Sequence, residues 1–90
     1  MTYLVLKYNL VVPEVFFFDL SHQVEEIVPA MIPGVKYTLE MLCGPTFWGP
    51  LTDGQKRVAG KCMVHMVENG ILPLHFAKGR HEYPKLYSLR

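Results

Sequence analysis

Residues 51–76 read LTDGQKRVAGKCMVHMVENGILPLHF, and this stretch carries the start, body and end of one helix followed by a strand. Thr52 and Gln55 form the T-x-x-Q pattern of a capping box, in which side chains satisfy backbone N–H groups that a first helical turn leaves unpaired. Gly70 follows the last periodic residue and can adopt the left-handed conformation that ends many helices. The sequence therefore predicts a helix over residues 52–69.

This predicted helix has two different faces. At 100° per residue, six apolar side chains share one broad stripe that we expect to face the core: Val58, Ala59, Cys62, Met63, Met66 and Val67. On the other side Arg57, Lys61 and His65 recur every four residues and form a row. A solvated face explains such a row as well as a ligand-binding face does. Gly60 in mid-helix costs about 1 kcal/mol relative to alanine, which predicts a close approach by another helix or by phosphate.

A basic hairpin is predicted after the helix, with strands over residues 71–76 and 83–89 and a loop between them. Pro73 lacks a backbone donor, so pairing should begin after it. Tyr87 and Leu89 are expected to close over the core. The tip carries Lys78, Arg80 and His81, a charge pattern typical of a phosphate or minor-groove contact, although a solubilising loop accounts for it equally well.

The first third of the chain is less clearly patterned. Residues 2–12 alternate as in a single strand, with Leu4, Leu6, Tyr8, Leu10 and Val12 on one face, and Pro13 ends it. Residues 15–20 fit either a buried strand or a helix beginning at Pro13, and we favour the strand. Ser21 should then cap a helix that Pro29 shortens.

The middle of the chain predicts a short strand over residues 35–37 and a brief helix that Thr38 caps and Gly44 ends. Residues 44–51 contain Gly-Pro twice and read as a rigid connector. Phe47 and Trp48 within it are expected to plug the core.

Composition and charge place limits on function. The chain has 90 residues, half of them hydrophobic, which predicts one globular domain. No apolar run reaches the roughly 18 residues of a membrane span and no signal peptide is visible, so we expect a soluble, cytoplasmic protein. Cys43 and Cys62 should be buried and reduced. Residues 1–50 have a net charge of −3 and residues 51–90 of +4, which favours a basic, phosphate-facing half unless the imbalance is chance.

Residues 35–90 resemble a winged helix-turn-helix domain in this order of elements: a short strand, a helix from Thr38, the helix over residues 52–69 and a hairpin wing. The fold class expected from the resemblance is α+β, a small winged-helix-like domain with an N-terminal strand or hairpin extension. The connector over residues 44–51 is longer than the turn usual in this family. The resemblance implies contacts to double-stranded DNA by two groups of side chains. The helix would supply Gln55, Lys56, Arg57, Lys61 and His65, and the wing would supply Lys78, Arg80, His81 and Lys85.

Other chemistry is poorly represented. Cys43, Cys62, His65 and His75 match no zinc module in their spacing, and Cys43 with His22 lacks a recognisable orienting group, so we expect neither a metal, a cofactor nor an enzyme. Two classes of function remain: a small DNA-binding regulator of transcription, or a protein-interaction module such as a phage or mobile-element inhibitor or adaptor. Exposed apolar N-terminal strands further predict a homodimer.

Overall fold

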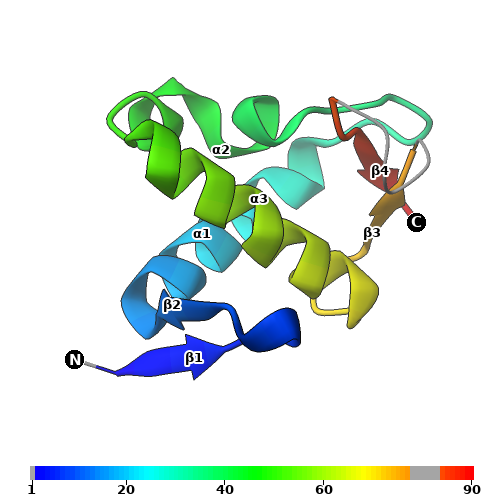
Figure 1. The fold of residues 1–90 in the computed structure, drawn as a ribbon. Helices are drawn as coiled ribbons and strands as arrows, with labels where there is room; N and C mark the ends of the chain where they lie inside the picture. The colour runs from blue at the N-terminus through cyan, green and yellow to red at the C-terminus, as the bar shows by residue number, and fades with distance from the viewer. Residues whose placement is uncertain (1, 78–83) are drawn as a thin grey trace.

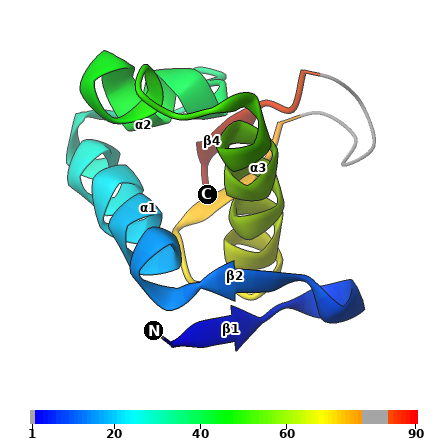
Figure 2. The same cartoon turned by 60° about the vertical axis from the view of Figure 1, so that its left-hand side comes forward.

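A computed structural model describes residues 2–77 and 84–90 as a small α+β domain with three helices and two antiparallel hairpins. The helices are α1 (Glu14–Ile27), α2 (Leu39–Trp48) and α3 (Asp53–Glu68). Figure 2 shows α1 and α3 running between two ends of the molecule. α2 lies across one end and the hairpin of β1 and β2 lies across the other. None of the helices in the described ranges is long and apolar enough to cross a membrane.

The N-terminal strand prediction was wrong, because residues 2–12 form a hairpin. β1 (Tyr3–Val5) pairs with β2 (Val11–Pro13) around the 3-10 turn η1 (Lys7–Asn9). The chain reverses where the Leu6 N–H donates to the Leu10 carbonyl at 2.7 Å and Asn9 adopts a φ of 60°. Asparagine tolerates this left-handed conformation better than most residues. The strand alternation continued through the turn and concealed it.

The preference for a strand over residues 15–20 was also wrong, since the alternative helix forms. α1 begins directly after Pro13 and runs past Ser21, which lies buried within it instead of capping it. The helix prevails because Phe17, Leu20 and Val24 fall on one buried face at helical spacing. Pro29 does shorten α1: the chain passes into the 3-10 turn η2 (Val28–Ala30).

In α2 the predicted cap is confirmed and the predicted connector is wrong. The Met41 N–H donates to Thr38 Oγ1 at 3.2 Å, and Gly44 breaks the helical path with a φ of 77°. Residues 45–48 then form a further helical turn, which Pro45 can begin because it needs no donor there. Phe47 and Trp48 are half-buried against the core, as expected.

The wing-like hairpin consists of β3 (Leu74–Phe76) and β4 (Tyr87–Leu89), and pairing does begin after Pro73. The predicted strand over residues 35–37 is reduced to one antiparallel bridge between Tyr37 and Tyr87, with both N–O distances at 2.8 Å. Figure 1 shows this hairpin beside the C-terminal end of α3. The predicted hairpin tip lies outside the described residues.

For α3, both ends and the buried face are confirmed. Thr52 Oγ1 accepts from the Gln55 N–H at 3.1 Å while Gln55 Oε1 accepts from the Thr52 N–H at 2.9 Å, and Gly70 takes a φ of 68°. Five of the six stripe residues are buried in the core, and Val58 packs against it. Cys62 and, from α2, Cys43 are buried free thiols.

Candidate functional site

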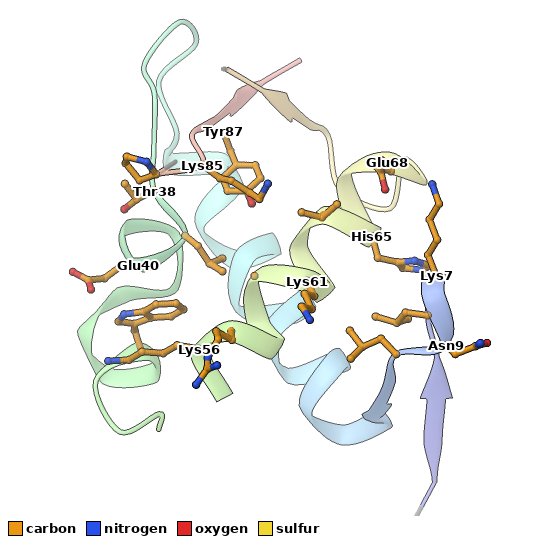
Figure 3. A pocket seen from close by; sticks show the side chains of 18 residues that line it. Lys7, Asn9, Thr38, Glu40, Lys56, Lys61, His65, Glu68, Lys85 and Tyr87 are labelled. Carbon is orange, nitrogen blue, oxygen red and sulfur yellow. The ribbon is translucent and has the colours of Figure 1, made fainter. Parts of the chain in front are cut away.

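The outer face of α3 lies in a groove of about 900 Å³, hereafter the α3 groove. Figure 3 shows α3 crossing its middle, with the η1 end of the N-terminal hairpin on one side and the start of α2 with the chain entering β4 on the other. α3 occupies this position because its apolar stripe packs inward against the core. The α3 groove is therefore built from four segments that are distant in sequence.

Most of the described residues predicted to contact DNA are brought together here. The α3 groove is lined by five of them: Lys56, Arg57, Lys61, His65 and Lys85. Gln55 is not among the lining residues, and its amide oxygen is occupied by the helix cap. The positions of Lys78, Arg80 and His81 are outside the described residues.

Lys56 and Trp48 form one wall. The Lys56 Nζ lies 5.6 Å from the centroid of the Trp48 ring, within the range of a cation–π interaction. The helical turn of residues 45–48 places Trp48 here, so the segment expected to be a connector becomes part of the site. This contact orients a positive charge at the edge of the α3 groove and leaves the indole as apolar lining.

His65 is held at the opposite end of the α3 groove by its neighbours. Its ring packs edge-on against Phe17 with the centroids 5.9 Å apart. Asn69 Nδ2 donates to the His65 carbonyl at 2.8 Å and lies 3.4 Å from its Nδ1. The imidazole is thus half-buried and packed against Phe17, in contrast to the exposed side chains of Arg57 and Lys61.

Apolar side chains also line the α3 groove. Leu10 from the hairpin, Leu39 and Trp48 from α2, and Val64 from α3 all contribute to it. Gly60 lies among them, and a Cβ built at this position has nothing within 4 Å. The close approach that the sequence predicted at Gly60 is therefore not made by the described part of this chain.

Positive charge predominates around the α3 groove. Its lining includes five Lys or Arg side chains, since Lys7 joins those predicted, and two carboxylates, Glu40 and Glu68. The exposed acidic residues of α1, Asp19, Glu25 and Glu26, lie outside the lining. The basic half of the sequence supplies four of the five Lys and Arg side chains in the lining, and Lys7 of the acidic half supplies the fifth.

Sequence reasoning missed the wall contributed by the N-terminal hairpin, including Lys7 and Asn9. Treating residues 2–12 as one strand removed the turn that carries both residues. The K-Y-N triplet in mid-strand was the available signal, because a polar run ending in asparagine is common in turns. That this turn lies against α3 is a tertiary fact without a local signal.

Among the described residues, a serine and a histidine are in contact in the wing-like hairpin. Ser88 Oγ lies 2.8 Å from His75 Nε2, but Ser88 is almost fully buried between paired strands, where the contact serves as a cross-strand hydrogen bond. Within residues 2–77 and 84–90, no three His, Cys, Asp or Glu side chains are grouped closely enough to hold a metal ion.

The chain matches no protein-family model, and no curated protein or solved structure is significantly similar to it. The geometry and charge of the α3 groove are therefore the basis for assigning a function.

Proposed function

We propose that the protein is a small DNA-binding regulator that contacts double-stranded DNA through the α3 groove. The observation that carries the proposal is that Arg57 and Lys61 of α3 share one surface with Lys85, which lies 24 residues after Lys61 near the C-terminus. Duplex DNA is a dense array of negative charge, and several cations on one surface are the usual means of binding it.

The order of elements supports a winged-helix reading of the domain. After α1, the chain makes its bridge at Tyr37, forms α2 and α3, and ends in the hairpin of β3 and β4. The bridging partner of Tyr37 is Tyr87 of β4, as expected when a short first strand joins a wing. In such a domain α3 would be the recognition helix, which reads base edges in the major groove.

Individual side chains differ in the role that this proposal gives them. Arg57 and Lys61 are exposed on α3 and would reach base edges or adjacent phosphates. Lys56 is committed to Trp48, and Lys85 enters beside the wing, so both are better suited to the phosphate backbone. His65 is half-buried and packs against Phe17, so its ring is less free than the exposed side chains of Arg57 and Lys61 to reach a base.

The test is duplex binding by the double variant Arg57→Ala/Lys61→Ala. Loss of base contacts should weaken binding by roughly 1–3 kcal/mol per residue, with an unchanged fold. Lys36→Ala is the matched control, because Lys36 is exposed and does not line the α3 groove. The same loss per charge removed in the control would assign binding to overall charge, and an unchanged affinity of the double variant would remove α3 from the interface.

A protein-interaction module is the second candidate, and a specific observation favours it. Leu10, Leu39 and Val64 line the α3 groove together with the basic side chains, and contacts to phosphate do not require apolar side chains. A concave surface lined by both apolar and charged side chains is typical of a site for a peptide or a helix.

We also propose that two copies pair through β1. Tyr3 and Val5 on this edge strand are 53% and 67% exposed, and Val11 beside them is 55% exposed. Pairing of edge strands around a two-fold axis would cover them and present two α3 helices to repeated half-sites. Light scattering at micromolar concentration should give twice the monomer mass, and a monomer would rule the pairing out.

A further inference from the structure

We propose that the α3 groove accepts an acidic amphipathic helix from a protein partner, which crosses α3 at Gly60 and excludes DNA while bound. This surface then has two mutually exclusive ligands. The binding of the helix stands without DNA, whereas its regulatory consequence rests on the proposed function.

The apolar side chains that line the α3 groove identify one half of the partner's chemistry. Leu10, Val64 and Trp48 come from three different elements and converge on one surface. Two of them lie outside α3, so the apolar lining is not simply the edge of that helix's buried stripe. A ligand that packs against these apolar side chains must present apolar side chains of its own on one side. An amphipathic helix does so at every third and fourth residue.

Charge complementarity identifies the other half. Five Lys or Arg side chains and two carboxylates border the α3 groove, and Arg57 and Lys61 are exposed on α3 itself. A partner with an apolar face flanked by Glu and Asp would meet the apolar and the basic side chains of the α3 groove together. A basic or neutral helix would satisfy the first requirement and fail the second.

Gly60 provides an observation independent of charge. It stands in the middle of α3, where alanine would make a more stable helix, and an added Cβ would meet nothing within 4 Å. Its φ is not in the left-handed region, so neither backbone geometry nor internal packing accounts for the glycine. A glycine on an open helix face lets a second backbone approach closely, which places the crossing point of the partner at Gly60.

The α3 groove, which is open to solvent, has room for a short stretch of such a helix. A helix about 10 Å in diameter and two turns long occupies roughly 850 Å³. The α3 groove measures about 900 Å³. Two turns are enough to present apolar residues at i, i+3, i+4 and i+7, the set that a helix uses to dock in a groove.

The experiment uses two fluorescent 14-residue peptides of identical composition, measured by anisotropy with the full-length protein. The first has leucine at i, i+3, i+4 and i+7 of a glutamate-rich helix, and the second has the same residues scrambled to abolish the apolar face. The amphipathic peptide should bind at least ten times more tightly than the scrambled one. Equal affinity of both peptides, or binding of neither, would overturn the proposal.

The crossing point is tested with Gly60→Leu, which places a bulky side chain in the α3 groove. Gly54→Leu on the same helix is the control. Gly54 lies outside the lining, and a Cβ there meets only Thr52 Oγ1 at an ordinary 3.9 Å. Only Gly60→Leu should weaken the binding of the amphipathic peptide, by tenfold or more. Circular dichroism should show that both variants are folded. Unchanged binding by folded Gly60→Leu would overturn the assigned site.

Competition separates the two proposals. The amphipathic peptide should release labelled duplex from the wild-type protein, and the scrambled peptide should not. If the protein binds the peptide but no duplex, the DNA proposal fails and the helix site stands. If it binds duplex but not the peptide, the helix site fails and the DNA proposal stands. If it binds both at once, mutual exclusion is wrong.

Discussion

The two faces of α3 share one backbone and one pair of caps, yet their residues answer to different requirements. On the inner face Ala59, Cys62 and Met63 are completely buried, and the fold explains each of them. On the groove face Lys61 is exposed, and a Cβ added at Gly60 would contact no other atom. The fold therefore requires neither residue. The position of a residue around the axis of α3 thus decides whether it is needed for stability or is available for binding.

The largest expected effect sharpens this contrast. Met63→Asp puts a carboxylate into the apolar core without a partner, which should cost at least about 3–5 kcal/mol and unfold so small a domain. Lys61→Asp, two residues earlier and exposed, should change stability by less than about 0.5 kcal/mol. Thermal melting followed by far-UV circular dichroism compares the two, and a native-like melt for Met63→Asp would mean that the inner face is assigned incorrectly.

The buried thiols should make stability fall in alkaline solution. Burial raises the pKa of Cys43 to about 12, and that of Cys62 to about 11 against a small lowering by a backbone hydrogen bond, from an ordinary value of 9.0. The folded state therefore holds these protons more tightly than the unfolded chain. Their contribution is complete below pH 9 and is lost as the pH rises through 11 and 12.

Thiol labelling gives an independent reading of the same two cysteines. Both should react slowly at neutral pH until denaturant is added, because labelling needs an accessible thiolate. Rapid stoichiometric labelling of the native protein would show that this side of α3 opens readily.

Removing the N-terminal cap of α3 should have an intermediate effect on stability. The cap supports the helix as a whole and belongs to neither face. Thr52→Ala removes the acceptor of the Gln55 N–H and should cost about 1 kcal/mol. Chemical denaturation of this variant checks the value. A loss of duplex binding much larger than the loss of stability would show that Thr52 has a further role.

Replacing the glycine on the groove face should have an effect of the opposite sign. Gly60→Ala should stabilise the protein by up to about 1 kcal/mol, since alanine favours the helix and its Cβ meets nothing. Denaturant midpoints of this variant and the wild type measure the difference. A destabilised variant would indicate an unrecognised internal contact on the groove face.

How far the sequence could predict this molecule depended on whether the signals were local. The capping box of Thr52 and Gln55, the Gly70 cap and the inner face of α3 follow from spacing alone, and all were confirmed. For residues 15–20, strand and helix patterns were equally compatible, and packing of Phe17 and Leu20 against the core decided for the helix. The turn at Asn9 was hidden by an alternation that continued across it.

The same distinction applies to the site. The row of Arg57, Lys61 and His65 was legible because it repeats along one helix. The walls from Lys7 and Trp48 were not, because nothing in either segment indicates that it packs beside α3. Long-range packing creates the α3 groove, so the sequence predicted a basic row and missed the concavity around it.

The central claim is that the groove face of α3 binds duplex DNA, and the most direct test is the affinity of the wild-type protein for duplex across a salt series. The account predicts measurable binding at low salt and a log–log slope of about −0.9 for each phosphate neutralised, so several contacts should give a steep decline. The slope should be shallower for Lys85→Ala than for the wild type. No duplex affinity even at low salt would contradict the claim and leave the basic row as a solvated face.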